Sequence, residues 1–317
     1  MYTVLITGGT GMIGTALSRQ LLSEGYNVII LSRNPKETAA SHPLGAELNF
    51  FRSTGSLYYS KWDVQKMTID PTALAEADFI IHLAGAGVAA QRWSEERKRE
   101  ILESRTRSSE LLLKALDEQP NKVRAVISAS AIGYYGPDNG TPFKEEDKPS
   151  NDFLGSTCQQ WEKSIDPVSQ LNIRLVKMRL GIVLANEGGA LKEFRKPLSM
   201  GVAAILGNGK QMVSWVHITD ICRAFIYAME HVKMKGVFNL TAPKPASNRE
   251  LTLTLAKKTN KKFFIPIPVP KFVLKAMLGE MSIEVLKSAT VNSQKIQSTG
   301  FYFLYPDIDL ALADLTS

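Results

Sequence analysis

The stretch VLITGGTGMIG, residues 4–14, decides the fold of this chain, because an apolar run leads into closely spaced glycines and then into a helical pattern. Gly9, Gly11 and Gly14 fit the spacing G-x-G-x-x-G. Gly8 with the same two later glycines fits the second common spacing, G-x-x-G-x-x-G. Either pattern predicts a strand, a sharp turn and a helix.

The glycine turn is typical of a dinucleotide site. Its small residues allow a sharp bend and let the backbone approach a pyrophosphate, which the N-terminus of the following helix attracts. A plain strand-to-helix turn is the alternative, but it does not need three glycines. The predicted cofactor-binding residues of the turn are Gly8, Thr10, Gly11, Met12, Ile13 and Gly14.

The end of the second predicted strand indicates which dinucleotide binds. In this fold an Asp or Glu about 20 residues after the turn usually binds the ribose 2′-hydroxyl. This chain has Ser32 and Arg33 there, and the next carboxylate is Glu37. The planar guanidinium of Arg33 suits a 2′-phosphate. We therefore predict NADP(H), bound with the help of Ser32 and Arg33; a surface arginine without a ligand is the alternative.

Outward from the turn, short apolar runs alternate with longer helical patterns. Predicted strands lie at residues 4–6, 27–31, 57–62, 79–83, 123–128, 173–180 and 237–240. Predicted helices lie at residues 12–24, 94–118, 153–170 and 220–231. The strands at 4–6, 27–31, 79–83 and 123–128 are apolar on both faces, which marks a parallel sheet covered by helices on both sides. The predicted fold class is therefore α/β, a Rossmann doubly wound parallel sheet.

The chain divides into two regions by composition. Residues 1–182 and 212–241 carry the alternating pattern and form the predicted dinucleotide-binding domain. Beyond residue 241 prolines interrupt the chain, most densely in IPIPVP at residues 265–270, and they disfavour long central strands. Residues 183–211 and 242–317 are therefore predicted to form a smaller C-terminal α/β cap that holds the substrate.

Composition excludes several classes of protein. The net charge is +7, but Lys and Arg are scattered, and the densest group, residues 92–107, is interleaved with glutamates. We therefore expect no nucleic-acid partner; an anionic small molecule explains the basic balance equally well. The N-terminus does not resemble a signal peptide and no long apolar run occurs, so we expect a cytoplasmic protein without a membrane partner. Cys158 and Cys222 have no CxxC or His-rich partner, so no metal is expected.

Several motifs in order give the chain a resemblance to the extended short-chain dehydrogenase/reductases. They are the glycine turn, LAG at residues 83–85, SAS at 128–130 and WVHITD at 215–220. A narrower resemblance, to the NADP-binding "epimerase family" branch, rests on RWSE at 92–95, SASAIGYYG at 128–136, WE at 161–162 and GEM at 279–281. The resemblance implies a Rossmann fold and an NADP cofactor. Members of that branch end in a small domain of unknown function, here roughly residues 264–310.

The same resemblance implies a catalytic pattern that this chain lacks. Members of the superfamily use a Ser that polarises the substrate and a Tyr-x-x-x-Lys pair that transfers a proton. Ser130 matches the Ser, but none of the nine tyrosines is followed four residues later by Lys. Alignment on Glu162 puts Leu154 and Cys158 at the Tyr and Lys positions. We therefore expect no ordinary sugar-nucleotide 4-epimerase or 4,6-dehydratase cycle.

The remaining candidate residues fall into three groups. The predicted catalytic residues are Ser130 and Tyr135 on the loop after the strand at 123–128, with Tyr134 as the alternative phenol. Further predicted cofactor-binding residues are Asp63, which is expected to meet the adenine, Leu83, Ala84 and Gly85, which are expected to face the ribose, and Arg105. Predicted substrate-binding residues are Arg92, Trp93, Arg179, Trp215 and His217. A lone His beside an apolar stretch is usually structural, so His217 is expected to act first as a helix-cap neighbour and second as a ligand.

Two functions are consistent with these residues. The first is an NADP-dependent oxidoreductase or epimerase that acts on a small substrate, for which the basic net charge allows an anion. The second is a nonenzymatic, NADP(H)-responsive binding or regulatory protein. The missing Tyr-x-x-x-Lys pair favours the second function, whereas the cluster of Ser130 and Tyr135 favours the first.

Overall fold

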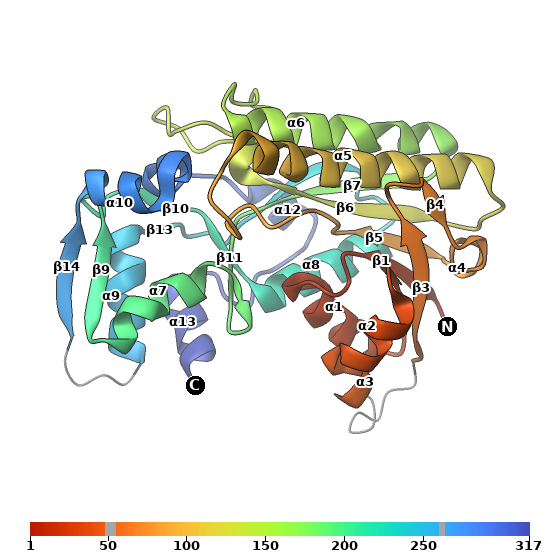
Figure 1. The fold of residues 1–317 in the computed structure, drawn as a ribbon, viewed down its shortest axis with the longest axis horizontal. Coiled ribbons are helices and arrows are strands. Elements are labelled where there is room, and N and C mark those ends of the chain that lie inside the picture. The colour runs from red at the N-terminus through yellow and green to blue at the C-terminus, as the bar shows by residue number, and fades with distance from the viewer. Residues whose placement is uncertain (48–54, 260–263) are drawn as a thin grey trace.

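A central sheet of eight strands forms the core of the described part of the chain (Figure 1). The computed structural model describes residues 1–47, 55–259 and 264–317. In spatial order the strands are β12 (Gly236–Leu240), β7 (Arg174–Leu180), β6 (Ala125–Ala131), β5 (Phe79–His82), β1 (Thr3–Thr7), β2 (Asn27–Ser32), β3 (Leu57–Asp63) and β4 (Thr68–Ile69). Strand β4 is antiparallel to β3, and the other neighbours are parallel. The predicted α/β Rossmann fold is confirmed.

Strand β1 lies inside the sheet because its side chains are apolar on both faces. Val4 pairs with Val28 of β2 on one side and with Phe79 of β5 on the other. Val4, Leu5 and Ile6 are fully buried. The parallel register brings the carboxyl ends of β1, β2, β5 and β6 to one edge, where ligands of such sheets bind.

Helices cover both faces of the sheet. Helices α1 (Met12–Ser23) and α8 (Ile218–Glu230) lie on one face, and α5 (Glu95–Glu118) and α6 (Phe153–Ile165) lie on the other (Figure 1). A separate hydrophobic core forms on each side. This arrangement explains why the strand sequences are apolar without alternation.

The helix predicted at residues 153–170 is shorter than expected. Helix α6 ends at Ile165, and a 3₁₀-helix, η2 (Asp166–Leu171), follows it. Pro167 causes the change, since proline lacks an N–H and its ring clashes with the preceding helical turn. The predicted boundary was therefore wrong by about one turn.

A smaller unit with its own core lies at one end of the sheet (Figure 1). It contains helices α7 (Gly189–Ser199), α9 (Asn248–Lys258), α10 (Lys271–Leu278) and α13 (Ile308–Thr316). Strands β9 (Val202–Leu206) and β14 (Ile265–Val269) pair in parallel beside them. Two further strand pairs join β8 (Ile182–Ala185) to β11 (Trp215–His217) and β10 (Met212–Val213) to β13 (Ala246–Ser247). The prolines of β14 thus occupy a short two-stranded sheet and not the central one.

The C-terminal segment returns from this unit to the Rossmann domain. Val291 forms a β-bridge with Phe143, and helix α12 (Gln294–Ser298) contacts β12. Ile296 and Phe301 belong to the same core as α1 and α8. This segment, residues 291–303, therefore connects the cap to the dinucleotide-binding domain in addition to the linkers; it is called the C-terminal strap below.

Short elements complete the described chain. They are α2 (Pro35–Ser41), α3 (Pro43–Glu47), α4 (Pro71–Glu76), η1 (Ile132–Tyr134), η3 (Gly279–Met281) and α11 (Ser282–Leu286). In the part of the chain that the structure describes, no helix combines the length and apolar character needed to cross a membrane. Within the same residues, no three His, Cys, Asp or Glu side chains gather as a metal site.

Candidate functional site

Three glycines of the turn are required by the packing of the chain itself. Gly8 has φ +68°, and a Cβ there would lie 2.8 Å from the carbonyl carbon of Leu83. A Cβ on Gly9 would lie 2.8 Å from the side chain of Ile30. A Cβ on Gly14 would lie 2.5 Å from the Cα of Gly9. The turn and α1 can therefore pack this closely only without side chains at these positions.

Gly11 differs from the other glycines because nothing in the fold requires it. It caps α1 with φ −77° and ψ 171°, an extended conformation that any residue adopts. A Cβ there would meet only the Gly8 carbonyl oxygen, at 3.4 Å. Among the described residues no side chain caps the helix. The space before the first turn of α1 is thus open, and its unpaired N–H groups favour an anion.

The other predicted turn residues differ in their surroundings. Thr10 is exposed, whereas Ile13 packs against the core beneath α1. Met12 lies close to Gly188 and Gly189, where α7 begins. The structure therefore brings the start of α7 beside the start of α1.

A buried polar network fixes the strand end beside the turn. The Thr7 hydroxyl lies 2.7 Å from Nδ1 of His82, and Nε2 of His82 lies 3.1 Å from the Ser109 hydroxyl. Thr7 Oγ1 also accepts hydrogen bonds from the N–H groups of Leu83 and Ala84. Burial lowers the pKa of His82 to about 3, so the imidazole is neutral. The network holds the predicted ribose-facing residues against β1.

The residues predicted to bind a 2′-phosphate, Ser32 and Arg33, lie at the end of β2. The Ser32 hydroxyl is 2.6 Å from the Thr38 hydroxyl and accepts a hydrogen bond from the N–H of Asn34. Arg33 is exposed and makes no ion pair with the described residues. Its guanidinium is therefore available to a ligand at the same edge as the glycine turn.

Asp63 lies at the end of β3. Its Oδ1 accepts hydrogen bonds from the N–H groups of Lys66 and Gln65, which lower the pKa of the carboxyl. One carboxylate oxygen is thus used by the following turn. Its other oxygen makes no hydrogen bond with the described residues, which leaves it for the predicted contact with adenine.

The Ser130 hydroxyl lies in a buried network and not at an open surface. Ser130 is 2% exposed and donates a hydrogen bond of 2.7 Å to Oε1 of Glu162. Arg179 binds the same carboxylate through Nε, at 2.7 Å, and Nη2, at 2.9 Å. Burial opposes the charge of Arg179, but the ion pair with Glu162 outweighs burial and raises its pKa. Predicted catalytic and substrate residues are thus linked to each other.

Tyr135 belongs to the same network. Its side chain is fully buried, its hydroxyl donates 2.8 Å to Oδ1 of Asn239, and Nη1 of Arg179 donates 2.8 Å to it. The ring stacks on Phe143 with centroids 5.0 Å apart. Burial raises the pKa of Tyr135 to about 12. The phenol therefore ties β6, β7 and β12 together.

Tyr134 has a different environment from its neighbour. Its side chain is half-buried, and its hydroxyl makes no hydrogen bond with the described residues. Cζ of Arg179 lies 3.4 Å from the centroid of its ring, a cation–π contact that fixes the ring. Of the hydroxyls of Ser130, Tyr134 and Tyr135, that of Tyr134 is the one left for a ligand.

Leu154 and Cys158, which stand at the positions of the missing Tyr-x-x-x-Lys pair, lie against the loop after β6. A Cβ on Gly133 would lie 3.3 Å from Cβ of Leu154 and 3.8 Å from Sγ of Cys158. Cys158 is buried, and burial raises the pKa of its thiol to about 12. A thiol in this state does not supply a thiolate nucleophile.

The side chain of Arg105 extends from α5 to the loop after β5. Its Nη1 donates hydrogen bonds to the carbonyl oxygens of Ala86, at 3.0 Å, and Ile101, at 2.8 Å. Its Cζ lies 5.0 Å from the ring of Trp161, and a Cβ on Gly85 would lie 3.1 Å from it. The guanidinium thus lines the loop that follows β5.

Arg92 joins the Rossmann domain to the cap, whereas Trp93 packs within the Rossmann domain. Nη2 of Arg92 donates a hydrogen bond to the carbonyl oxygen of Ala276 in α10, and Trp93 stacks edge-on against the first residue of α6. Lys98 forms an ion pair with Glu280 at 2.5 Å. The sequence motifs at residues 92–95 and 279–281 therefore lie together.

Trp215 and His217 lie in the interior. Trp215 is fully buried and donates from Nε1 to the carbonyl oxygen of Lys244. His217 is 1% exposed, and its Nδ1 accepts the N–H of Thr219 at the start of α8. Its Nε2 lies 3.3 Å from Asp314 of α13, while burial lowers its pKa. The expected helix-cap role of His217 is present, and neither side chain reaches an open surface.

Sequence reasoning did not identify Asn239 or the role of Glu162. Asn239 is fully buried within an otherwise apolar strand, and a polar residue in such a run was the available signal. Glu162 served only to align the helix that carries it. Their partners come from other strands and loops, so local patterns could not pair them.

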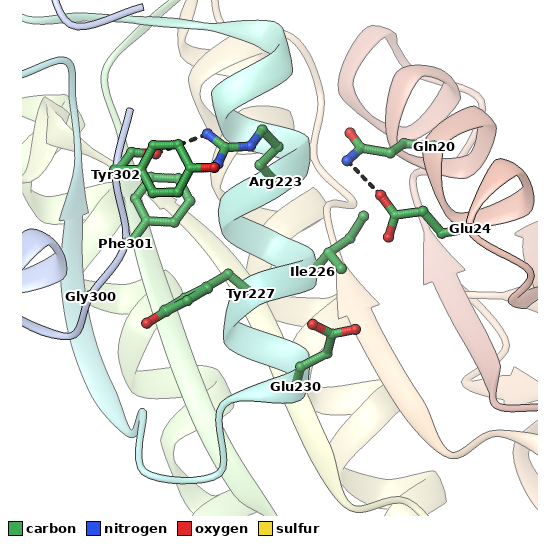
Figure 2. A pocket seen from close by; sticks show the side chains of 9 residues that line it. All are labelled: Gln20, Glu24, Arg223, Ile226, Tyr227, Glu230, Gly300, Phe301 and Tyr302. Atoms are coloured by element: carbon green, nitrogen blue, oxygen red, sulfur yellow. Dashed lines mark hydrogen bonds between the residues drawn. The ribbon is translucent and has the colours of Figure 1, made fainter. Parts of the chain in front are cut away.

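A separate cavity of about 200 Å³ lies between α1, α8 and the C-terminal strap (Figure 2). Gln20 lines it from the last turn of α1, Glu24 from the C-cap of that helix, and Arg223 from α8. Arg223 donates to the carbonyl oxygen of Tyr302 at 2.8 Å. Because this cavity lies at the end of α1 away from Gly11, it is distinct from the glycine turn.

Comparison with family profiles identifies two regions. The NAD dependent epimerase/dehydratase family matches residues 4–165 and 168–241. A domain of unknown function, DUF1731, matches residues 269–315. The two matches cover the Rossmann strands and most of the C-terminal region, as the sequence resemblance predicted.

Individual proteins are similar over the whole chain. The epimerase family protein SSP1921 of Staphylococcus saprophyticus is 33% identical over 99% of this chain and 99% of its own length. The human epimerase family protein SDR39U1, isoform 2, has a crystal structure with NADPH. Its sequence is 27% identical to this chain, and the two structures match with a TM-score of 0.82 over 99% of each chain. A UDP-glucuronic acid 4-epimerase of Bacillus cereus, in complex with UDP-glucuronic acid and NAD, shares the fold at 20% identity, with a TM-score of 0.78 and coverage of 99% and 98%.

Proposed function

This chain belongs to the NAD dependent epimerase/dehydratase family, and from that premise we propose that it is an NADP(H)-binding oxidoreductase or epimerase-like enzyme. The proposed dinucleotide lies along the carboxyl edge of the sheet, with its pyrophosphate at the start of α1. The substrate lies between this edge and the C-terminal cap. We propose a small substrate, and the net charge of +7 favours an anionic one.

The observation that carries the proposal is the geometry of Gly11. The other glycines of the turn are explained by packing, but the missing side chain of Gly11 leaves open space before unpaired helical N–H groups. Unpaired N–H groups at the start of a helix favour an anion such as a pyrophosphate. Thr10 and Met12 flank this space, and Leu83, Ala84 and Gly85 follow β5 beside the turn.

NADP(H) is the proposed form of the cofactor. Arg33 has no acidic partner within the described residues, and no carboxylate at the end of β2 is placed to bind a ribose 2′-hydroxyl. A guanidinium can bind a 2′-phosphate through two hydrogen bonds. The human relative with NADPH supports this choice, whereas the Bacillus cereus structure contains NAD.

The residues of this chain would handle the proton that accompanies redox chemistry at the site. When bound, the nicotinamide supplies or accepts a hydride. Ser130 and Tyr135 were the predicted proton-handling residues, but both hydroxyls are committed to buried partners. Tyr134, on the same loop, has an uncommitted hydroxyl and a ring fixed by Arg179. We therefore propose Tyr134 as the group that exchanges a proton with the substrate oxygen.

A second candidate function is supported by the same corner. Leu154 and Cys158 replace the usual proton-transfer pair, and the Cys158 thiol is buried and protonated. A protein that binds NADP(H) and changes a partner surface without turnover would tolerate these residues. Cofactor binding with no turnover on any substrate tested would favour this function.

Calorimetric titration with NADPH and NADH tests the proposed cofactor site. We expect NADPH to bind at least tenfold more tightly than NADH, and Arg33→Asp to abolish or reverse the difference, because the carboxylate repels a 2′-phosphate and can accept a 2′-hydroxyl. Arg99→Asp makes the same charge change on an exposed position of α5 and should leave the preference unchanged. Equal affinities for the two cofactors in the unmodified protein would overturn the NADP assignment.

A further inference from the structure

A short segment of the cap, residues 288–292, lies between the loop after β6 and strand β10. It belongs to the part of the chain matched by DUF1731 and connects α11 to α12. Its backbone forms isolated β-bridges on both sides: Val291 pairs with Phe143 of the loop, and Ala289 pairs with β10. The cap therefore places a strand-like segment directly beside the loop that carries Tyr134.

The loop after β6 needs contacts from elsewhere in the chain. Across residues 132–152, all of which the structure describes, η1 is the only helix or strand. A loop of this length without regular structure is costly to order, so other elements must fix its conformation. Tyr134 lies near the start of this loop, and the position of its hydroxyl therefore depends on those other elements.

Asp138, which follows Tyr134 on the loop, holds the loop to the segment. Its carboxylate accepts hydrogen bonds from the Ser288 hydroxyl and from both the N–H and the hydroxyl of Thr290. The N–H of Asp138 donates to the carbonyl oxygen of Ser288 at 2.8 Å. Hydrogen bonds to a carboxylate are about twice as strong as those between neutral groups. Among the described residues, every partner of the Asp138 carboxylate thus belongs to the cap.

Val291 completes the small hydrophobic core beside Tyr134. It is 4% exposed and packs with Ile132, Tyr135 and Phe143, which all belong to the loop. The ring of Tyr134 packs against this cluster. The cap therefore contributes to the apolar support of the Tyr134 ring as well as to the polar contacts of its loop.

The segment is also fixed on its other side, to the Rossmann domain. The Ser214 hydroxyl accepts the N–H of Val291 at 2.9 Å and donates to the carbonyl oxygen of Ala289 at 2.8 Å. The side-chain amide of Asn239 donates to the carbonyl oxygen of Asn292 at 3.1 Å. Because both sides of the segment are bound, it can hold the loop in one place.

We propose that the segment 288–292 of the cap positions the phenol of Tyr134 in the catalytic site, and that Asp138 is the positioning residue through which it acts. The inference rests on the proposed function, in which Tyr134 exchanges a proton with the substrate oxygen. Such an exchange requires the two oxygens to lie at hydrogen-bond distance. A small shift of the loop therefore slows turnover without weakening the binding of the cofactor.

The position of the Tyr134 ring can be measured without a substrate. Tyr134 is labelled as 3-fluorotyrosine and followed by ¹⁹F NMR in the unmodified protein and in Asp138→Asn. Asp147→Asn is the matched control, because it makes the same change in the same loop, where the carboxylate binds the N–H of Lys144. We expect the resonance to shift or broaden in Asp138→Asn and to stay unchanged in Asp147→Asn.

A milder variant covers the case in which Asp138→Asn does not fold. Thr290→Val removes one hydrogen bond to Asp138 but keeps the backbone N–H and the shape of the side chain. We expect a smaller change of the Tyr134 resonance in the same direction. An unchanged resonance in folded Asp138→Asn, or in Thr290→Val where Asp138→Asn does not fold, would overturn the proposal.

Turnover distinguishes a positioning role from general support of the loop. With NADPH and a panel of aldehydes and ketones, we expect Asp138→Asn to lower kcat about tenfold while KM and the affinity for NADPH stay unchanged. In a Tyr134→Phe background the same change should have no further effect, because the group that Asp138 positions has been removed. An equal loss in both backgrounds would overturn the proposal.

The two measurements separate this inference from the proposed function. If the unmodified protein binds NADPH without turnover, or if Tyr134→Phe leaves turnover unchanged, Tyr134 is not the proton-exchanging group and the proposed function fails at that residue. A Tyr134 resonance that changes in Asp138→Asn and not in Asp147→Asn would still support the placement of Tyr134 by the cap. A resonance that changes in neither variant would overturn that placement as well.

Discussion

The glycine turn and the loop after β6 lie at the same edge of the sheet, yet they relate to the sequence in opposite ways. In the turn, Gly8 and Gly14 are fixed by nearby backbone atoms and Gly9 by the side chain of Ile30 in β2, whereas Gly11 is left open. At the end of β6 and in the loop after it, Ser130 and Tyr135 are bound to Glu162, Arg179 and Asn239, which come from other elements. A motif that constrains the backbone can be recognised locally, whereas the exposure of a hydroxyl depends on the whole fold.

The largest expected effect is a difference in stability between variants of Gly14, which the packing of the fold requires, and of Gly11, which we propose contacts the ligand. In Gly14→Ala the added methyl group meets the backbone of Gly8 and Gly9, which cannot move away, so we expect a loss of about 3 kcal/mol or more in the free energy of unfolding. In Gly11→Ala the methyl group meets only one carbonyl at 3.4 Å, and we expect a loss within about 1 kcal/mol. Urea unfolding measures both.

Cofactor binding completes this test of the turn. Gly11→Ala should fold but bind NADPH at least tenfold more weakly, because the methyl group occupies the space proposed for the pyrophosphate. Native circular dichroism with undiminished NADPH affinity would contradict the role of Gly11. Gly87→Ala provides a control for the substitution itself, since the backbone there has no positive φ and a Cβ would lie 3.6 Å from Cβ of Ala90, an ordinary contact.

Most of the fold could be predicted because its signals are local. The apolar strands, the helix after the turn and the helix starts near residues 94, 153 and 220 follow from periodicity and capping residues. The end of α6 was missed although Pro167 marks it. The return of the C-terminal strap to the Rossmann core could not be predicted, because Ile296 and Phe301 carry no signal of the partner they pack against.

The candidate site could be predicted only in part, for the same reason. Gly11 and Arg33 lie free at the edge where the sequence placed them. Trp215 and Tyr135 are buried, and they bind Lys244 and Asn239, which are 29 and 104 positions away in the chain. No spacing rule in the sequence contains such contacts.

The buried His82 beside the glycine turn makes the stability of the protein depend on pH. His82 has a folded pKa of about 3 against an ordinary value of 6.5, so below pH 6.5 the unfolded chain takes up a proton that the folded chain cannot. Its contribution to stability is complete above pH 6.5 and falls as the pH is lowered, by about 2 kcal/mol at pH 5. The free energy of unfolding should therefore drop between pH 7.5 and pH 5.

A histidine variant isolates this contribution from those of other titrating groups. His82→Gln should be less stable at pH 7.5 because the contacts with Thr7 and Ser109 change, but its loss between pH 7.5 and pH 5 should be about 2 kcal/mol smaller than that of the unmodified protein. His231→Gln, at an exposed position, is the control. Equal losses in the unmodified protein and His82→Gln would rule out the buried neutral imidazole.

The smallest expected effect is the difference in the free energy of unfolding between Tyr135→Phe and Tyr134→Phe. Tyr135→Phe leaves a buried Asn239 oxygen without its donor and removes one of the two acceptors of Arg179 Nη1, so we expect it to lower the free energy of unfolding by about 1.5 kcal/mol. Tyr134→Phe keeps the ring over Arg179 and removes a hydroxyl that makes no hydrogen bond with the described residues. Its stability should change by less than about 0.5 kcal/mol.

The two variants should rank in the opposite order in turnover: Tyr134→Phe, which costs little stability, should lose more activity than Tyr135→Phe. If Tyr134 only supported the structure of the loop, this opposite order would not be observed. With NADPH and a panel of aldehydes, ketones and nucleotide sugars, we expect Tyr134→Phe to lose at least a hundredfold in kcat while its NADPH affinity stays unchanged, because a proton donor is removed without disturbing the fold. Tyr135→Phe and Ser130→Ala should retain turnover at temperatures where they remain folded. If instead Tyr135→Phe abolishes turnover and Tyr134→Phe does not, the buried phenol becomes the catalytic one and the loop must open during the reaction. Absence of turnover in the unmodified protein, with NADPH bound, would favour the nonenzymatic function.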